Sequence, residues 1–262
     1  MTETNIERVG KLFAIDTAQH EMTILLDEGL HRHVRFMRPR PGSSSYWYEL
    51  ITVPHALIFR GDYESLVFSR TEDMFGFFRS NPDRPAMRIS PDYWAEKLTS
   101  DRGCVKRYDQ DKFEQIVKEL TVEAIRDHSA PRGIGRAVRE QILNDEDIHY
   151  EDGARRALDD FEFGAKNVAE CPCGGRVEVD ADLFIPASWR DQHPRGLGHP
   201  YKTDHVPGFR FTDTWELDFK DFDHGYLWAC HAIVAGIAQY DAAKAQAARP
   251  VETVAVPSGA VA

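Results

Sequence analysis

The sequence lacks most features that identify an enzyme or a membrane protein. It has no nucleophile elbow and no glycine-rich phosphate loop, because Gly133 and Gly135 lack the strand-turn-helix setting that such a loop requires. It shows no signal peptide, and its longest apolar run, 225–238, is too short to span a bilayer. These absences argue against the common nucleotide-binding and hydrolase families, and we expect a protein of the reducing cytoplasm without a membrane partner.

Basic residues and cysteines are also scarce. The 262 residues include 32 Lys and Arg against 43 Asp and Glu, which gives a formal net charge of −11. Nucleic-acid affinity depends on cationic contacts to phosphates, so this charge argues against general nucleic-acid binding. The simplest interpretation is a solvated acidic surface. The 4 cysteines are expected to be reduced thiols.

What the sequence does contain is a run of short strands in its first 70 residues. Aromatic and β-branched residues alternate within 46–79, and Pro54 interrupts the pattern because proline has no amide to donate to a sheet. Gly29 falls between two further alternating segments, as in a hairpin. The expected strands are 22–26, 31–37, 47–53, 56–59, 65–68 and, further along the chain, 208–219.

Helices are expected to cover one face of this sheet. Thr4 and Glu7 form a capping box that predicts a first helix. Ser69 with Glu72, or Thr71 alone, predicts the start of a helix after the last early strand. The segment 225–240 is apolar on almost every side, which is typical of a deeply buried helix.

These patterns predict an α+β fold. Its antiparallel sheet has about five or six strands packed by helices, and a helical lobe lies beside it over roughly 90–163. We expect one domain over 1–248, in which 164–207 is a loop-rich insertion whose clear strand is 176–184. The tail 249–262 is expected to be disordered.

One candidate for chemistry is an acidic run that precedes the apolar helix. Clustered carboxylates with an imidazole can hold a divalent metal for phosphodiester hydrolysis. The simpler interpretation is a solvated face together with a helix cap, because Asp223 directly precedes the helix. The catalytic candidates are Glu216, Asp218, Asp221 and His224.

A second candidate is a zinc site in the insertion. Thiolates and imidazoles are zinc ligands, and a segment with few apolar residues often needs a metal to hold it together. Cys-Pro-Cys is tighter than the usual spacing of a zinc knuckle, so the alternative is two thiols in a turn. The metal-binding candidates are Cys171, Cys173, His193, His199 and His205.

Two further patterns lie on the predicted early strands. His31 and His33 share one strand face, where a histidine pair could titrate or bind a metal. The aromatic residues 46–48 with Arg35 and Arg38 could stack single-stranded nucleic acid. Core packing, with the arginines reaching to solvent, is the simpler account.

Six blocks of the sequence carry a resemblance to known proteins: EMTILLDEGLHRHVRF, YWYELITVPHALIFRGDYESLVFSRTEDMFGFFR, PDYWAEKL, ARRALDDFEF, GFRFTDTWELDF and YLWACHAIVAGIAQYD. These blocks are similar to an uncharacterised group of proteins from bacteriophages, prophages and actinobacterial mobile elements. This resemblance covers most of the chain, with 164–207 standing as an insertion, and it implies an accessory protein expressed in a bacterial host. No established activity comes with the group.

The leading hypothesis is therefore a non-enzymatic accessory protein that binds a host or phage protein. It rests on the negative charge, on the missing catalytic motifs and on the resemblance. One alternative is a metal-dependent enzyme that acts on nucleic acid or nucleotides through the acidic run. Another is a protein that sequesters a small ligand between sheet and helix.

Overall fold

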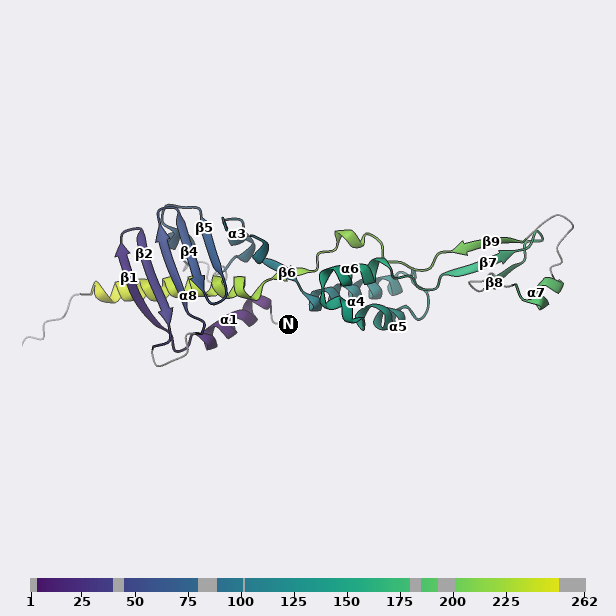
Figure 1. The fold of residues 1–262 in the computed structure, drawn as a ribbon, viewed down its shortest axis with the longest axis horizontal. Helices are drawn as coiled ribbons and strands as arrows, with labels where there is room; N and C mark the ends of the chain where they lie inside the picture. The colour runs from purple at the N-terminus through teal and green to yellow at the C-terminus, as the bar shows by residue number, and fades with distance from the viewer. Residues whose placement is uncertain are drawn as a thin grey trace, which may run out of the picture. The chain divides into compact units, whose positions relative to one another are not determined.

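The computed structural model describes residues 4–39, 45–79, 89–100, 102–179, 185–192 and 201–249. The chain divides into two compact units, one formed by 1–107 with 222–262 and the other by 108–221 (Figure 1). The expectation of one domain stays a prediction, because two compact units can still unfold as one cooperative structure.

The first unit contains the predicted antiparallel sheet. Its strand order is β1-β2-β3-β4-β5, so each strand pairs with its neighbour in sequence. The alternation of apolar and polar residues correctly predicts five strands and the α+β class. The strands are β1 Glu21–Glu28, β2 His31–Met37, β3 Tyr48–Val53, β4 Ala56–Gly61 and β5 Ser65–Ser69.

One face of this sheet is apolar and buried. Val34, Leu50, Phe59 and Leu66 lie opposite one another on four adjacent strands, and each is 0% exposed. Because strand side chains alternate between faces, such a row places every second residue in the core. Burial of side chains of this size contributes about 1.5–3 kcal/mol each, so this face fixes the register.

Helix α8, His224–Ala247, runs across this buried face (Figure 1). Asp223 begins it by accepting a hydrogen bond from the Gly225 amide at 2.8 Å, as expected for an acidic N-cap. A Cβ atom on Gly236 would lie 2.8 Å from Leu50 Cδ1, so glycine lets the helix approach β3 closely. His231 Nε2 donates to Ile6 O at 3.0 Å, and burial lowers the pKa of this histidine. The predicted buried helix is confirmed.

Helix α1, Asn5–Asp16, packs against α8 in the same layer. Thr4 and Glu7 form the predicted capping box, which satisfies amides that the first helical turn leaves unpaired. The Trp228 indole of α8 donates to Asp16 Oδ2 at 3.1 Å. Apolar packing and end contacts together hold the two helices in place.

Helix α2, Met74–Phe78, starts at a different residue from the ones predicted. Asp73 is its N-cap and accepts from the Phe75 amide at 3.0 Å, whereas the prediction gave that role to Ser69 or Thr71. Ser69 belongs to β5, whose ladder continues to the end of that residue. The sheet therefore extends further than the local capping pattern suggests.

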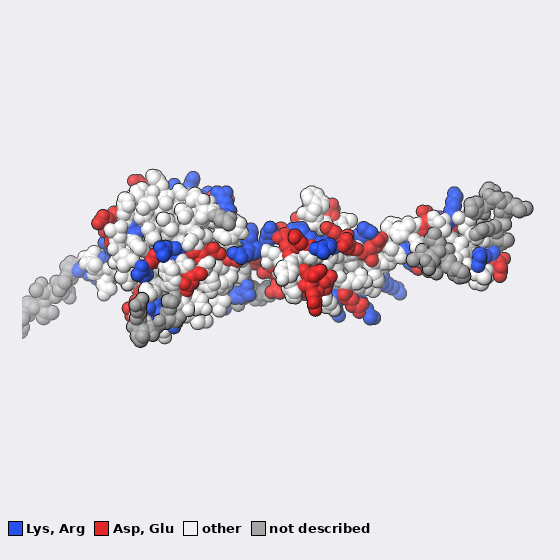
Figure 2. All heavy atoms as spheres, in the orientation of Figure 1, with Lys and Arg blue, Asp and Glu red and all other residues white. Residues whose placement is uncertain are grey.

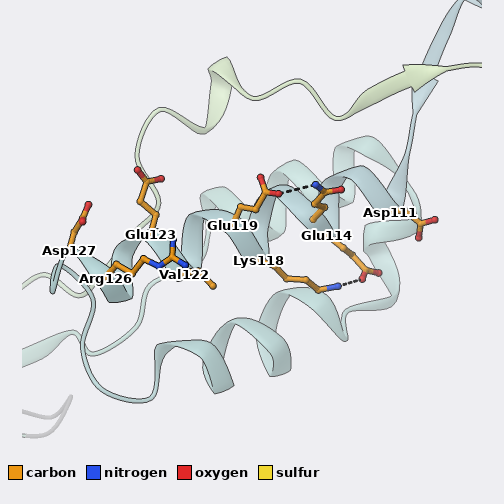
Figure 3. A pocket seen from close by; sticks show the side chains of 9 residues that line it. Asp111, Glu114, Lys118, Glu119, Val122, Glu123, Arg126 and Asp127 are labelled. Carbon is orange, nitrogen blue, oxygen red and sulfur yellow. Dashed lines mark hydrogen bonds and ion pairs between the residues drawn. The ribbon is translucent and has the colours of Figure 1, made fainter. Parts of the chain in front are cut away.

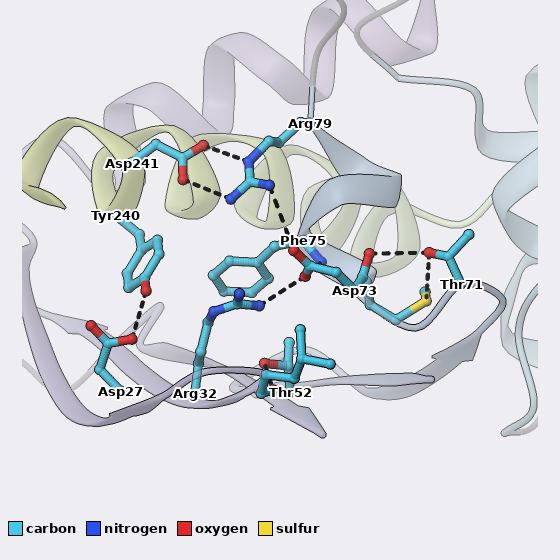
Figure 4. Close-up of polar contacts among 11 residues, drawn as sticks. Asp27, Arg32, Thr52, Thr71, Asp73, Phe75, Arg79, Tyr240 and Asp241 are labelled. Carbon is cyan, nitrogen blue, oxygen red and sulfur yellow. Dashed lines mark hydrogen bonds and ion pairs between the residues drawn. The ribbon is translucent and has the colours of Figure 1, made fainter. Parts of the chain in front are cut away.

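Asp73 also takes part in a charged network that links β2, α2 and α8 (Figure 4). It lies 2.8 Å from Arg32 Nη1 on one side and 3.7 Å from Arg79 Nη1 on the other. Arg79 in turn makes two hydrogen bonds to Asp241, at 2.8 and 3.0 Å. The Arg32 guanidinium lies 5.0 Å from the Phe75 ring centroid, a cation–π distance. Every charge in this network has an opposite charge beside it.

The rest of the first unit is short α3, Pro91–Ala95, with η2, Arg102–Cys104. Strands β6, Lys106–Tyr108, and β10, Lys220–Phe222, pair with each other where the chain leaves the first unit and returns to it.

The second unit contains the predicted helical lobe. Its helices enclose a separate core in which Phe113, Val117, Leu158 and Phe219 are at most 1% exposed. The elements are α4 Gln110–Arg126, α5 Ile134–Val138, a π-helical turn η3 Arg139–Leu143, η4 Glu146–His149, α6 Glu151–Asp159 and η5 Thr214–Glu216.

The segment 208–219 is not a sixth strand of the early sheet, which corrects the prediction. It belongs to the second unit, where Phe209 pairs with Phe163 in an isolated bridge. The backbone of Asp213 has φ +54°, which ends any extended conformation. Trp215 is 76% exposed. The aromatic alternation reflects packing onto helices here.

The predicted insertion contains more regular structure than expected. Three antiparallel strands lie in the order β8-β7-β9, whereas the sequence pattern indicated one strand. The two missed strands consist mainly of charged and polar residues and so carry no apolar alternation. The elements are β7 Lys166–Glu170, β8 Arg176–Val179, α7 Ala187–Gln192 and β9 Lys202–Val206.

Candidate functional site

The second face of the five-stranded sheet is built differently from the face under α8. Its side chains are half-buried or exposed, with one exception, Glu49, whose side chain is only 2% exposed. The residues that share this face in register are His33, Arg35, Glu49, Ile51, Ile58, Arg60 and Val67.

Glu49 sits at the centre of a charged cluster on this face. Its carboxylate lies 2.6 Å from Arg35 Nε, 3.1 Å from His33 Nε2 and 3.3 Å from Arg60 Nε. Burial by itself would raise the pKa of Glu49, but hydrogen bonds from Arg35 and His33, with the attraction of their charges, outweigh it and lower the pKa. Glu49 is therefore an ion-pair partner and is poorly placed to act as a proton-accepting base.

The cluster connects the three central strands. His33 and Arg35 come from β2, Glu49 from β3 and Arg60 from β4. The Arg60 guanidinium also lies 5.4 Å from the Trp47 ring centroid. The predicted stacking of nucleic acid on arginine and aromatic residues stays a prediction, but Arg35 and Arg60 here already have partners within the sheet.

The two edges of the sheet are treated differently by the chain. Along β5, the Ser69 amide donates to Lys97 O at 2.9 Å and the Thr99 amide donates to Val67 O at 2.7 Å. Between these bonds Leu98 is 0% exposed. The segment 97–99 therefore covers the β5 edge and satisfies backbone groups that would otherwise face water.

Strand β1 forms the opposite edge, and no strand among the described residues pairs with its outer side. Three consecutive apolar residues are exposed there, Ile24 at 38%, Leu25 at 45% and Leu26 at 41%. A β-bulge between Ile24 and Leu26 leaves Leu25 without a partner on β2. An apolar edge strand of this length attracts another strand unless it is protected.

Acidic residues flank this apolar run. Glu21 and Glu28, at the two ends of β1, are both exposed. The Asp27 carboxylate is already engaged within the protein, because it accepts hydrogen bonds from the Tyr240 hydroxyl at 2.7 Å and from Lys244 Nζ at 2.8 Å. These hydrogen bonds, that from Lys244 first, lower the pKa of Asp27. The β1 edge therefore presents an apolar centre between two carboxylates.

The predicted acidic site lies on the surface of the second unit. Asp218 accepts from the Lys220 amide at 2.9 Å and lies 3.6 Å from Lys112 Nζ. Glu216 is exposed in η5, and Asp221 is half-buried in β10. The Asp218 carboxylate meets a lysine and a backbone amide, which suits a solvated face better than a catalytic cleft.

The fourth catalytic candidate, His224, belongs to the first unit, where its ring lies 5.4 Å from Tyr63. Asp223 beside it serves as the N-cap of α8, the simpler role given by the sequence. Among the described residues, no group of three or more His, Cys, Asp or Glu side chains is arranged to hold a metal ion. The catalytic assignment stays a prediction.

The described zinc candidates are separated along β7. Cys171 and Cys173 have their sulfurs 2.8 Å apart. His205 lies opposite Asn167 and contacts its Oδ1 at 3.1 Å. Cys171 is four residues further along than Asn167, which is about 13 Å of extended chain. His205 is therefore out of reach of the thiols. The two other candidates, His193 and His199, lie outside the described residues.

A hollow of about 860 Å³ lies along α4, and all the residues that line it belong to α4 or to its C-cap (Figure 3). Lys118 and Glu114 pair at 2.8 Å, and Gln115 donates to Glu119 at 2.8 Å. These contacts join neighbouring turns of the same helix and leave no convergent polar groups for a ligand. The lining residues are Asp111, Glu114, Gln115, Lys118, Glu119, Val122, Glu123, Arg126 and Asp127.

Charge is distributed unevenly over the surface. On the face shown in Figure 2, acidic and basic side chains are interspersed over the helices of the second unit, whereas much of the visible first unit carries neither. No described helix is both long enough and apolar enough to cross a membrane. The described residues form an α+β protein whose five-stranded sheet has α8 across one face and the Glu49 cluster on the other.

Comparison of the chain with protein-family models, with curated proteins and with solved structures gives no match. The function is therefore argued from the sheet itself.

Proposed function

We propose that this chain is a non-enzymatic binding protein that docks a segment of another protein against strand β1. The observation that supports this most strongly is the exposed run Ile24–Leu26 on an edge that no described strand pairs with, while 97–99 covers the opposite edge. In strand addition, an extended peptide gains main-chain hydrogen bonds from the edge and places alternate side chains against it. An open edge of this kind is suited to that mode of binding.

The charges on β1 specify the partner. Carboxylates at Glu21 and Glu28 flank the apolar centre, so the best complement is an extended segment with apolar residues in the middle and Lys or Arg at its ends. A second copy of this chain fits less well. Antiparallel pairing of β1 with itself about its centre would bring these carboxylates close together, and like charges directly opposite are destabilising.

The same proposal includes an accessory role in a bacterial host, in the setting of a bacteriophage or mobile element. The resemblance of the sequence blocks supports this setting. The absence of catalytic motifs in the sequence, together with the fully engaged carboxylate of Glu49, supports binding as the activity.

A peptide-binding measurement tests the docking mode. The probe is a short peptide of alternating valine and threonine with lysine at both ends, and the controls are the glutamate-flanked peptide and one with a central proline. We expect the lysine-flanked peptide to bind at least about tenfold more tightly than either control, or by about 1.4 kcal/mol. Proline weakens binding because it removes a ladder hydrogen bond.

Matched variants locate the site. Leu25→Lys should lower peptide binding and the capture of partner proteins from a bacterial host by at least about tenfold. Ile15→Lys makes the same charge change at a residue that is 71% exposed on α1, and should leave both unchanged. Equal loss in both variants, or turnover of a nucleotide or nucleic acid by a protein that captures no partner, would contradict the proposal.

A further inference from the structure

The tight turn between β7 and β8 carries two cysteines. The turn is closed by backbone hydrogen bonds from Cys171 N to Gly175 O and from Gly174 N to Cys171 O, both 2.8 Å long. Gly174 has φ +88°, a conformation that favours glycine. Pro172 restricts the backbone between the two cysteines. The turn therefore holds the two side chains in a defined arrangement.

The two sulfurs lie side by side within this turn. Cys173 Sγ is 2.8 Å from Cys171 Sγ, and the Cys173 amide also donates to Cys171 Sγ at 3.4 Å. Cys173 is exposed, whereas Cys171 is only 4% exposed. Cys230, by contrast, is fully buried in α8, and burial raises its pKa far above the usual range. The turn is therefore the place where a thiol pair meets solvent.

We propose that Cys171 and Cys173 form a redox-active dithiol that exchanges with low-molecular-weight disulfides. A disulfide bond requires sulfurs at about 2.05 Å, so only a small movement separates this dithiol from the bonded state. Holding the reacting atoms together replaces a bimolecular step with an intramolecular one. The ring closed by a Cys-Pro-Cys disulfide is very small, and constrained or exposed disulfides are the readily reduced ones. Such a bond suits reversible exchange.

The order of steps follows from exposure. The Cys173 thiolate attacks one sulfur of a disulfide RSSR, forms a mixed disulfide and releases RS⁻. Cys171 then loses its proton to solvent and attacks the Cys173 sulfur, which releases the second RS⁻. Two electrons pass from the dithiol to RSSR, and the products are the Cys171–Cys173 disulfide and two RSH. Contact with the Cys173 sulfur raises the pKa of Cys171, consistent with its acting second.

A metal centre is a poorer fit for the described atoms. Structural zinc requires four ligands in tetrahedral geometry, and two sulfurs supply only half of them. His205 is held at Asn167, away from the turn.

The test uses the full-length protein with oxidised glutathione as the probe. Trypsin cleaves after Lys166 and Arg176, so one peptide, 167–176, carries both cysteines of the turn and no other. When the remaining thiols are blocked after oxidation, mass spectrometry should find this peptide two hydrogens lighter than its dithiol form. Excess reduced glutathione, added before blocking, should restore the dithiol. The Cys230 peptide should react at least about tenfold more slowly, because its thiol is buried.

Two variants separate the steps. Cys171→Ser should trap a stable glutathione adduct on Cys173, because the resolving thiol is gone, whereas Cys173→Ser should give at least about tenfold less adduct on Cys171. Stable adducts on both thiols of the unsubstituted protein would overturn the proposal. So would stoichiometric zinc that protects both thiols from glutathione.

Discussion

The two edges of the five-stranded sheet present the same kind of backbone but receive opposite treatment. At β5 the segment 97–99 adds main-chain hydrogen bonds and buries Leu98 completely. At β1 the chain adds no such cover among the described residues and leaves three apolar side chains in water. Proteins usually protect sheet edges against unwanted pairing, so an edge left open beside a covered one indicates a surface kept for a partner.

Hydrogen exchange gives the largest contrast between the edges. The amides of Val67 and Ser69 donate to the segment that covers β5, at Ser100 and Lys97. They should therefore exchange only when the sheet opens. Amides of β1 that point away from β2 should exchange at least about a thousandfold faster, a difference of about 4 kcal/mol in opening free energy. Deuterium uptake read by NMR measures this, and equal protection at both edges would show that β1 is covered.

Truncating one leucine at each edge tests the comparison through the free energy of unfolding. Leu98→Ala at the covered edge should lower the free energy of unfolding by about 2–5 kcal/mol, because it opens a cavity in the core. Leu25→Ala at the open edge should change it by no more than about 0.5 kcal/mol. Urea titration of both variants measures the difference, and similar losses would mean that Leu25 is buried against something.

A substitution at Glu49 tests the charged cluster on the central strands, between the two edges. Glu49→Gln should lower the free energy of unfolding by about 1–3 kcal/mol at neutral pH, because it removes the charge that pairs with Arg35 and Arg60.

The pH dependence of this loss has a defined sign. Folding lowers the pKa of Glu49 below its usual 4.5, so its contribution is present above that value and disappears as pH falls through the folded-state pKa. The difference between Glu49→Gln and the unsubstituted protein should shrink below about pH 4.5. A loss that stays constant down to pH 2 would assign the effect to packing.

A small effect is expected from Ser100→Ala at the covered edge. The Ser100 hydroxyl accepts from the Val67 amide at 3.2 Å. Its removal should cost about 0.5–1.5 kcal/mol in free energy of unfolding and leave peptide binding at β1 unchanged. Thermal unfolding with parallel binding titration checks both, and weakened binding would show that the two edges are coupled.

The sequence predicts the five strands and α8 because their signals are local. Alternation around Leu50 and Phe59 follows the strand period, and the apolar composition near Trp228 marks a buried helix. The segment 208–219 shows why alternation alone is insufficient. Phe209 and Phe211 alternate as in a strand, yet they pack against each other and onto the helices of the second unit.

The candidate surface could not be predicted in the same way. Whether Leu25 faces water depends on which strand forms the edge, and strand order is a property of the whole fold. Glu49 gives no local sign of its partners, because His33 and Arg60 come from different strands. Polar strands such as β7 and β9 are stabilised by pairing, which composition does not reveal.

Helix α8, which covers the first sheet, is synthesised after every other described element. At about 5–20 residues per second, roughly 10 to 35 s pass between synthesis of β5 and synthesis of Tyr240. During that time the apolar sheet face that includes Val34 and Leu50 is not yet packed against α8. The nascent polypeptide must therefore be shielded by a chaperone or kept loosely collapsed until α8 has been synthesised.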